Sequence, residues 1–337
     1  MSDEIADYDS NGYDYRTYWD GRDYERMAED RALRRLVPRL GRSGWLVDFG
    51  GGFGRNAAHY RCLAARYVIV DYSATNLVNA SNLLADDIAA GRAFLVRADL
   101  NALPFVDTAF DAAVVIRVLH HLPDLDRALA EMGRVVGGRW LIDVPIKHHL
   151  LAVARGIARR DRRTVRGPQP VRTTSGAEPF WNFQLAAVRR LLSRSGWRTR
   201  VVASVNNLRR WDRRLPPAAV RALRPAVLLV ESLAQRCGIG WWGPNQFVLA
   251  ERRVPARAGG DANATGTGAP TVAGLLACPG CHGDLVWSAD EASCVDCPGR
   301  YERVDGYWDF TLPPAAARFR SPRGGQAGVA PRRSAAA

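Results

Sequence analysis

A glycine-rich turn follows a short apolar segment near residue 50. The stretch from Leu46 to Arg55 reads Leu-Val-Asp-Phe-Gly-Gly-Gly-Phe-Gly-Arg, and its alternate glycines are Gly50, Gly52 and Gly54. Glycine admits positive φ angles and leaves no side chain between the turn and a ligand. The helical pattern that follows would add the amide groups of a helix N-terminus to the same space. These residue types predict a loop that holds a nucleoside-bearing cofactor.

One acid stands close to this turn. Asp48 is separated from Gly50 by one residue, so the pattern is Asp-x-Gly-x-Gly-x-Gly and not the Gly-x-Gly-x-x-Gly of dinucleotide-binding loops. A carboxylate beside the turn would repel a pyrophosphate and suits a cofactor with a cationic amino group. The loop resembles motif I of the class I S-adenosylmethionine (SAM)-dependent methyltransferases. The resemblance implies that the glycines border SAM, and we expect Asp48 to orient the loop and the cofactor ammonium group.

Three further segments agree with this family in order along the chain. Asp71 ends the segment Val-Ile-Val-Asp-Tyr, and Asp99 lies in Val-Arg-Ala-Asp-Leu. The resemblance implies that Asp71 accepts hydrogen bonds from the ribose hydroxyls, that Asp99 accepts one from the adenine amino group, and that Leu100 lies against the adenine ring. Residues 110–121 resemble the fourth strand of the family and its trailing loop, with Arg117 at the cofactor edge. Asp71 can also cap the next helix, and the alternative for Asp99 is to cap a turn.

Short apolar segments alternate with longer helical segments from residue 45 onward. The expected strands span residues 45–49, 67–71, 93–98, 112–116, 139–144, 197–204 and 246–251. The expected helices span residues 24–40, 55–66, 74–90, 125–135, 147–160, 183–195 and 220–237. This alternation is typical of βαβ units and a parallel sheet. Together with the resemblance, it predicts an α/β fold with a doubly wound, seven-stranded Rossmann-like methyltransferase sheet, a helical cap and a small C-terminal zinc ribbon.

Changes in composition divide the chain into five parts. These are an acidic lead-in (1–30), the methyltransferase-like domain (31–252) with cap segments at 147–180 and 205–245, a linker (253–270), a cysteine module (271–312) and a basic tail (313–337). The linker composition predicts flexibility, and the acid-free tail predicts disorder. Within the cap, a Pro/Gly/Thr-rich loop is expected to run to residue 177.

Two adjacent histidines follow the fourth expected strand. His120 and His121 would lie at the carboxyl edge, where open α/β sheets bind ligands. Either imidazole could act as the general base that takes a proton from a hydroxyl or amine acceptor. The alternative is that one packs under the sheet while the other borders the methionine end of the cofactor. We expect two other reactive side chains, Cys62 and Cys237, to be core residues.

Positive charge is concentrated in the middle of the chain. The 337 residues carry a net charge of +13, whereas residues 147–224 alone hold nineteen Lys or Arg against three acids, a net charge of +16. This arginine-rich cap could bind an anionic partner such as RNA or an anionic lipid surface. The alternative is a compositional bias toward arginine without a partner. Because the same region also holds several aromatic residues, we expect it to select the methyl acceptor.

Four of the six cysteines form two Cys-x-x-Cys pairs separated by twelve residues: Cys278, Cys281, Cys294 and Cys297. Two such knuckles can close one tetrahedral thiolate site, so we expect structural Zn²⁺, with a rubredoxin-like iron site as the alternative. A module of this size buries little core, so the metal would stabilise its fold. Residues 275–285 and 304–306 resemble the small zinc-ribbon activator subunits of tRNA methyltransferases, although residues 302–303 and 307–308 depart from that pattern. The resemblance implies a built-in stabiliser or substrate guide.

These features predict a SAM-dependent methyltransferase that transfers a methyl group by in-line displacement to an oxygen or nitrogen acceptor. The long cap favours a small or lipid-linked metabolite as the acceptor, whereas the basic segment and the cysteine module favour RNA or a translation factor. A scaffold that binds SAM without turnover is an alternative of another class. Apolar runs fall far short of the roughly 20 residues that a membrane span needs. Without a hydrophobic signal region, and with paired cysteines typical of a reducing compartment, we expect a cytoplasmic protein.

Overall fold

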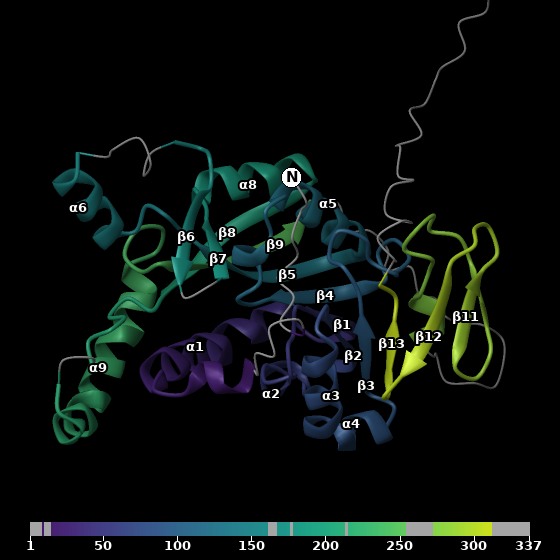
Figure 1. Ribbon diagram of the computed structural model, residues 1–337. Coiled ribbons are helices and arrows are strands. Elements are labelled where there is room, and N and C mark those ends of the chain that lie inside the picture. Colours follow the sequence, from purple (N-terminus) through teal and green to yellow (C-terminus); the bar gives the residue numbers. More distant parts are fainter. Residues whose placement is uncertain are drawn as a thin grey trace, which may run out of the picture.

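The computed structural model describes residue 9 and residues 15–160, 167–175, 178–212, 215–253 and 272–311. Its centre is a twisted sheet covered by helices on both faces (Figure 1). The strands of the expected domain are ordered β3-β2-β1-β4-β5-β9-β8. They are β1 (Ser43–Phe49), β2 (Ala64–Asp71), β3 (Ala93–Arg97), β4 (Phe110–Val115), β5 (Val136–Pro145), β8 (Trp197–Val205) and β9 (Asn245–Arg252). Strands β1 to β5 run parallel and β9 antiparallel, which confirms the predicted seven-stranded sheet.

Two hydrophobic cores occupy the two faces of the sheet. One core includes residues of α5 and α8, and the other includes residues of α1, α3 and α9. In β1, Val47 and Phe49 enter the first core and Leu46 enters the second, as expected for a strand that is buried on both faces. The helices are α1 (Asp23–Leu36), α2 (Ala57–Tyr60), α3 (Ala74–Leu83), α4 (Ala85–Ala89), α5 (Leu125–Val135), α6 (Leu150–Ala158), α8 (Leu185–Arg194) and α9 (Pro217–Cys237). Short 3₁₀ helices are η1 (Tyr15–Trp19), η2 (Val37–Leu40), η3 (Leu119–His121) and η4 (Val272–Leu275).

Several predicted boundaries are wrong. The helix expected over 55–66 is the single turn α2, because β2 already begins at Ala64. The helix expected over 74–90 divides at Leu84, whose φ and ψ of −108° and 18° leave the helical region. The loop expected up to residue 177 contains the strand β6 (Val171–Ser175), which forms a hairpin with β7 (Glu178–Asn182) directly after it. The hairpin segments are rich in the β-branched and aromatic residues that favour strands.

The cap helix α9 is joined to α1 through one buried carboxylate. Glu231 is fully buried and accepts hydrogen bonds from the Tyr24 hydroxyl at 2.6 Å and from the backbone N–H groups of Asn206 and Asn207 at 3.0 Å. The side-chain amide of Gln235 donates to Glu231 at 3.2 Å and to the Ala28 carbonyl at 2.8 Å. Glu231 and Gln235 of α9 therefore face the protein.

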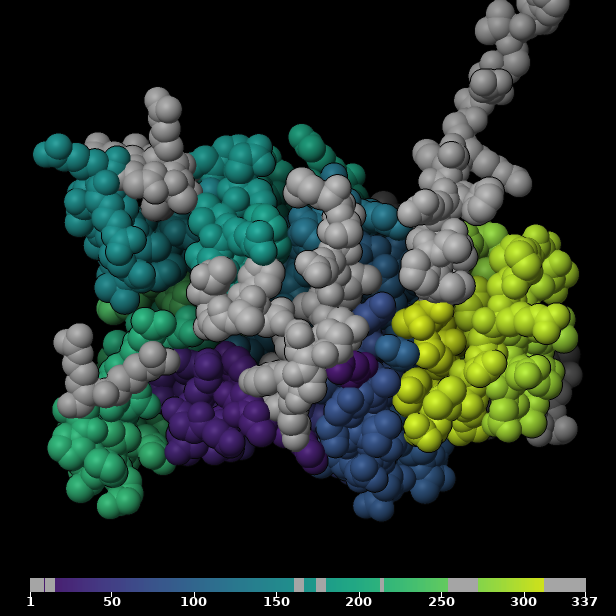
Figure 2. Space-filling model, viewed as in Figure 1, coloured from purple at the N-terminus to yellow at the C-terminus, as the bar shows by residue number. Residues whose placement is uncertain are grey.

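The cysteine module continues the central sheet. Its strands are β10 (Leu285–Trp287), β11 (Glu291–Cys294), β12 (Arg300–Val304) and β13 (Tyr307–Asp309). Strand β13 pairs in parallel with β3, with Trp308 opposite Val96 and Asp309 opposite Arg97, which extends the sheet to eleven strands among the residues described. Tyr301 and Phe310 enter the core shared with α5 and α8. Figure 2 shows the yellow module lying directly against the blue segments of the domain.

Because β13 pairs with β3, the edge of β3 is covered by a strand of the same chain and is no longer open. The sequence predicts a module that follows a linker, but it does not predict that the module joins the sheet. The proposed linker at 253–270 and tail at 313–337 lie almost entirely outside the described residues, as does most of the stretch before residue 15. None of the described helices is long and apolar enough to cross a membrane.

Candidate active site

The glycine loop lies at the carboxyl end of the central strand β1. Gly50, Gly52 and Gly54 have φ angles of 62°, 56° and 80°. A Cβ atom at Gly50 would lie 2.4 Å from a methyl carbon of Val118, so only glycine fits this turn. The N–H of Gly50 donates to the Val70 carbonyl at 2.7 Å, which ties the turn to β2. The predicted loop therefore exists, with glycine required by both its conformation and its close packing.

Asp48 is a buried carboxylate beneath this loop. Its side chain is 1% exposed, and one oxygen, Oδ2, accepts a hydrogen bond from the Tyr60 hydroxyl at 2.8 Å. The other oxygen, Oδ1, has no hydrogen-bond partner among the residues described. Burial raises the pKa of Asp48 to about 7, against the effect of the Tyr60 hydrogen bond. This unsatisfied acceptor fits a cationic ligand group in the loop.

Asp71 links the glycine loop to the helix that follows β2. Its Oδ2 accepts a hydrogen bond from the Gly52 N–H at 2.8 Å, and its Oδ1 accepts from the Ser73 N–H at 3.0 Å. Burial raises the pKa of Asp71, and these two hydrogen bonds oppose that shift. The carboxylate is thereby held at the edge of the sheet with lone pairs remaining for a ligand. The Ser73 hydroxyl, and not Asp71, caps α3 by accepting from the Asn76 N–H.

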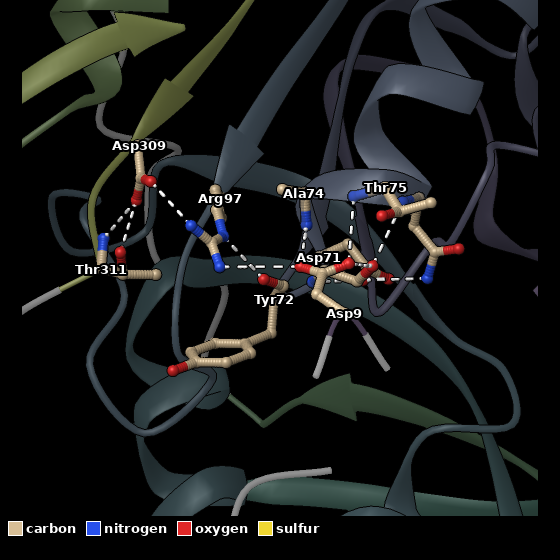
Figure 3. Close-up of polar contacts among 10 residues, drawn as sticks. Asp9, Asp71, Tyr72, Ala74, Thr75, Arg97, Asp309 and Thr311 are labelled. Atoms are coloured by element: carbon tan, nitrogen blue, oxygen red, sulfur yellow. Dashed lines mark hydrogen bonds and ion pairs between the residues drawn. The ribbon is translucent and has the colours of Figure 1, made fainter. Parts of the chain in front are cut away.

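An acid from the N-terminal segment also reaches this edge. Asp9 accepts hydrogen bonds from the Ser73 hydroxyl at 2.6 Å and the Ala74 N–H at 2.7 Å, so it is a second cap of α3. Figure 3 shows Asp9 close to Asp71, with Arg97 between Asp9 and Asp309. The sequence analysis did not identify Asp9, because no local spacing links it to α3, which lies more than sixty residues further along the chain.

Arg97 connects this edge to the cysteine module. Its guanidinium contacts Asp309 of β13 at 2.9 Å and Asp9 at 3.7 Å, and its Nε donates to the Tyr72 carbonyl at 2.8 Å. Tyr72 directly follows the predicted ribose-binding Asp71. One arginine therefore joins the module, the N-terminal segment and the end of β2 (Figure 3).

Asp99 and Leu100 follow β3 on the same edge. The N–H of Ala98 donates to the Asp71 carbonyl at 3.2 Å, so the ends of β2 and β3 are adjacent. Oδ1 of Asp99 accepts hydrogen bonds from the Asn101 N–H and side-chain amide at 2.8 and 3.0 Å, which is the turn-capping arrangement. Leu100 is partly buried against the core. The assignment of both residues to the adenine of the cofactor remains a prediction.

Arg117 follows β4 in a left-handed conformation with φ of 62°. Its guanidinium pairs with Glu29 of α1 at 3.6 Å, hydrogen-bonds the Tyr18 hydroxyl, and lies 4.5 and 5.1 Å from the ring centroids of Tyr18 and Trp19. The side chain therefore binds the first elements of the chain. Its predicted role at the cofactor remains a prediction.

A buried acid near Arg117 was missed by the sequence analysis. Asp143 of β5 is 2% exposed and accepts two hydrogen bonds from the Asn245 amide at 3.0 and 3.1 Å. Burial, and then the negative charge of Glu29, raise the pKa of Asp143 to about 7. The signal available was an acid inside an otherwise apolar strand, which is costly unless the acid has partners.

His120 and His121 stack on each other under the hairpin. Their ring centroids are 4.0 Å apart, and they lie 5.0 and 5.5 Å from the Phe180 ring of β7. Burial lowers the pKa of His120 well below its usual value, and burial together with Arg117 lowers that of His121 to about 4. Both imidazoles are therefore uncharged at neutral pH and can accept a proton only weakly.

Two other cysteines differ from the prediction. Cys62 and Cys237 are exposed and not part of the core. Cys62 lies in the turn between α2 and β2, and Cys237 ends α9. Neither lies at the carboxyl edge of β1 to β4, where the predicted cofactor residues gather.

The four predicted metal ligands form one cluster. The sulfur atoms of Cys278, Cys281, Cys294 and Cys297 all lie within 4.8 Å of one another. The Cys278–Cys297 and Cys281–Cys294 sulfur distances are 3.5 and 3.4 Å, too long for disulfides and close to the ~3.8 Å edge of a tetrahedron with Zn–S bonds of about 2.3 Å. The Tyr301 hydroxyl lies 3.0 Å from the Cys278 sulfur and can orient it. The donor set fits a structural Zn²⁺.

A separate cavity of about 400 Å³ lies between α8 and β8. Four arginines line it: Arg189, Arg190, Arg198 and Arg253. The cavity lies near Trp197, which is opposite Arg252 at the end of the sheet remote from the glycine loop. It is therefore not part of the candidate active site.

Part of the chain is similar to known methyltransferases. Residues 47–140 match the family model described as a methyltransferase domain. The chain is 38% identical over 108 residues to a protein of Encephalitozoon cuniculi named as a methyltransferase, covering 31% of this chain and 46% of the other. It is 33% identical over 102 residues to the ubiquinone/menaquinone biosynthesis C-methyltransferase UbiE of Hahella chejuensis, covering 29% and 41%.

Among solved structures, the chain is similar to magnesium protoporphyrin IX methyltransferase from Synechocystis PCC 6803 with bound SAH. The match covers 73% of this chain and 96% of the other chain. The identity is 15% and the TM-score 0.47. The chain spans about half the length of the curated relatives that it matches. The family match is confined to residues 47–140, which lie within a Rossmann-like α/β sheet, and a four-cysteine cluster lies on added C-terminal strands.

Proposed function

We propose that this chain binds SAM at the carboxyl edge of β1 to β4 and transfers its methyl group to an acceptor held under the cap. The observation that carries the proposal is the glycine loop with a buried carboxylate on each side, Asp48 beneath it and Asp71 at the end of β2. Three glycines with positive φ let a ligand approach the backbone, which a loop with side chains would prevent. The match of residues 47–140 to methyltransferase domains supports the same assignment.

Each predicted residue would hold one part of the cofactor. Asp71 would accept the ribose hydroxyls through the lone pairs left by its two backbone hydrogen bonds. Oδ1 of Asp48, which lacks a hydrogen bond among the described residues, would face the ammonium group. Asp99 and Leu100 would receive the adenine amino group and ring. All of these assignments rely on hydrogen-bond acceptors and apolar surface that lie at the same carboxyl edge of the sheet.

Bound SAM would supply an electrophilic methyl group on a sulfonium sulfur, and the protein would supply position and environment. The cap would hold the acceptor against His120, His121 and Phe180, whose rings lie in contact at tilted angles. With its pKa near 4, His121 would act as a base only toward an acceptor whose proton becomes acidic during transfer. We therefore assign the histidines first to acceptor packing and second to proton transfer.

The acceptor proposed here is a small or lipid-linked metabolite. The hairpin β6–β7 covers the histidines with Phe180, and such a ring surface would suit a compact, largely apolar acceptor. The similarity to a ubiquinone/menaquinone C-methyltransferase supports a small-molecule acceptor and adds carbon to the possible acceptor atoms.

RNA is the second candidate acceptor. It is favoured by the cavity with four arginines between α8 and β8, which could bind a phosphate backbone. Because this cavity is remote from the glycine loop, it would serve as a docking site and not as the site of transfer. RNA retention with a steep log–log dependence on salt, lost in the double variant R190Q/R198Q, would support this candidate.

We propose that the zinc module braces the cofactor edge from within the same chain. The contacts that support this are the β13–β3 pairing and the Arg97 network that joins Asp309 to the Tyr72 carbonyl beside Asp71. Zinc would hold the module rigid, so that β13 keeps β3 and its following loop in place. This role is the stabiliser expected from the resemblance to activator subunits.

One experiment tests the main proposal. The full chain is incubated with SAM labelled on its methyl group and with fractionated cell extract, and the label is followed into lipid, small molecules, RNA and protein. Asp71→Asn should lower SAM affinity at least tenfold, since hydrogen bonds to a charged acceptor contribute about 1.5–3 kcal/mol each. Asp86→Asn, an exposed acid on α4, is the matched control. SAM that binds but is not consumed with any fraction would favour a scaffold, and absence of SAM binding would refute the proposal.

A further inference from the structure

The exposed face of the cap helix α9 is more apolar than its buried face. Leu229, Val230 and Leu233 are 62%, 48% and 55% exposed, whereas Glu231 and Gln235 are buried and hydrogen-bonded to α1 and to the turn that follows β8. A surface helix normally turns its apolar stripe toward the core. Here the buried carboxylate network determines the orientation of α9 and leaves the leucine row facing outward. Exposure of this kind, in adjacent large side chains, marks an interaction surface.

The apolar surface continues onto the beginning of α6. Leu150 and Leu151 are 43% and 58% exposed, and Trp241, in the turn after α9, is 46% exposed. The N–H of Leu150 donates to the Trp241 carbonyl at 2.7 Å, and the N–H of Trp241 donates to the Gly238 carbonyl at 3.3 Å. These bonds hold the end of α9, the turn and the start of α6 together. Figure 1 shows α6 and α9 at the same end of the molecule.

Exposed arginines flank this surface. Arg155 on α6, Arg159 directly after α6, and Arg221 and Arg236 on α9 are all exposed. A fifth arginine, Arg224 of α9, pairs with Asp23 of α1 at 3.6 Å. Between them, α6 and α9 contain a single acid, the buried Glu231. An exposed apolar row with a tryptophan and flanking arginines is the composition of helices that lie in the interface of anionic membranes. The long arginine side chains can reach phosphate groups while the leucines enter the acyl boundary.

We propose that α9, the turn at Trp241 and the start of α6 form a docking surface for anionic lipid bilayers. RNA would be bound by the arginines but would gain little from exposed leucine and valine side chains. A second copy of this chain, placed symmetrically on the same face, would bring the same arginines together and repel. An anionic bilayer satisfies both the apolar row and the positive charge.

The docking surface lies beside the acceptor side of the sheet. Strand β5 ends at Pro145, the N–H of Ile146 donates to the Pro244 carbonyl at 2.7 Å, and α6 begins at Leu150. Docking would therefore place the cap and the carboxyl edge of β5 next to the bilayer, where a lipid-linked acceptor could enter. This last step rests on the proposed function, whereas the docking itself does not.

The test is cosedimentation of the full chain with vesicles of phosphatidylcholine alone or of phosphatidylcholine and phosphatidylglycerol at a ratio of 7:3. We expect binding to the anionic vesicles, with at least a fivefold lower partition coefficient for L229Q/L233Q. The control Leu83→Gln changes a leucine that is 56% exposed on α3 and should bind like the parent. The variant R221Q/R236Q should lose the preference for anionic over neutral vesicles.

Two results would overturn the proposal. The first is that the parent protein does not sediment with anionic vesicles. This result would count against the proposal also if light scattering finds a dimer that L229Q/L233Q dissociates. The other is equal binding of L229Q/L233Q and Leu83→Gln, including the case in which only RNA retention responds to the arginine changes. SAM affinity, measured on each preparation without vesicles, separates a failure of docking from a failure of the proposed function.

Discussion

The ionisation of Asp48 should make the stability of the protein depend on pH in a predictable direction. Its pKa in the folded state is about 7, against 3.8 for an ordinary aspartate, because it is buried. Between these two values the folded protein keeps a proton that the unfolded chain has released. The contribution of Asp48 to the free energy of unfolding therefore falls as pH rises from about 4 to about 7, and is constant above that range. Asp48→Asn removes this titration while keeping an oxygen that can accept the Tyr60 hydrogen bond.

The magnitude follows from the two pKa values. Relative to Asp48→Asn, the parent should lose about 2–3 kcal/mol of unfolding free energy between pH 5 and pH 8, at 1.36 kcal/mol per pKa unit. The assay is urea unfolding of both proteins at the two pH values without SAM, comparing midpoints at equal slopes. Comparing the two proteins cancels the titrations of all other groups. A difference between them that changes by less than 0.5 kcal/mol, on the scale of experimental error, would refute the reasoning.

Four other predictions concern the cofactor, the module and the histidines. Because an ionised Asp48 suits the SAM ammonium group, SAM affinity should rise about tenfold from pH 6 to pH 8, and titration calorimetry of Asp48→Asn should show no such rise. Asp309→Asn should lower the free energy of unfolding by about 1 kcal/mol, because the ion pair between Asp309 and Arg97 is partly exposed. The same change should weaken SAM binding severalfold. The control in the thermal unfolding and binding assays is Asp290→Asn, which changes an exposed acid of the module. Chelation of zinc should lower the melting temperature and SAM affinity together, and metal analysis should find one zinc per chain. Because His121 is neutral above a pKa of about 4, the rate should show no histidine-dependent acid limb between pH 6 and pH 8; a limb lost in His121→Asn would contradict the assignment.

Much of the cofactor edge could be predicted because its signals are local. The glycines at alternate positions, the acid two residues before Gly50 and the acid that ends β2 all lie within short segments whose spacing sets their geometry. The same is true of the cysteine cluster, since each Cys-x-x-Cys knuckle brings two sulfur atoms together by its own turn. Alternation of apolar strands and helices was enough for the seven-stranded sheet, although α2 and α4 are shorter than the patterns indicated.

Other residues of the site depend on partners far away in the chain. Asp9 reaches α3, Asp143 pairs with Asn245, and Phe180 covers the histidines through a hairpin that the composition suggested to be a loop. No periodicity in a short segment encodes such contacts, because they depend on how separate elements pack.

From the sequence alone one can predict the methyltransferase-like cofactor loop, the four-cysteine cluster and most strands and helices of the domain. Only the packing of the folded chain shows that β13 joins the domain sheet at β3, that Arg97 connects the module to the cofactor edge, and that α9 turns its leucines outward. The difference lies in how far apart along the chain the interacting residues are. Backbone conformation and local spacing are set by neighbouring residues, whereas strand pairing and the burial of Glu231 minimise the free energy of the whole chain, which can reverse the orientation that a local apolar pattern predicts.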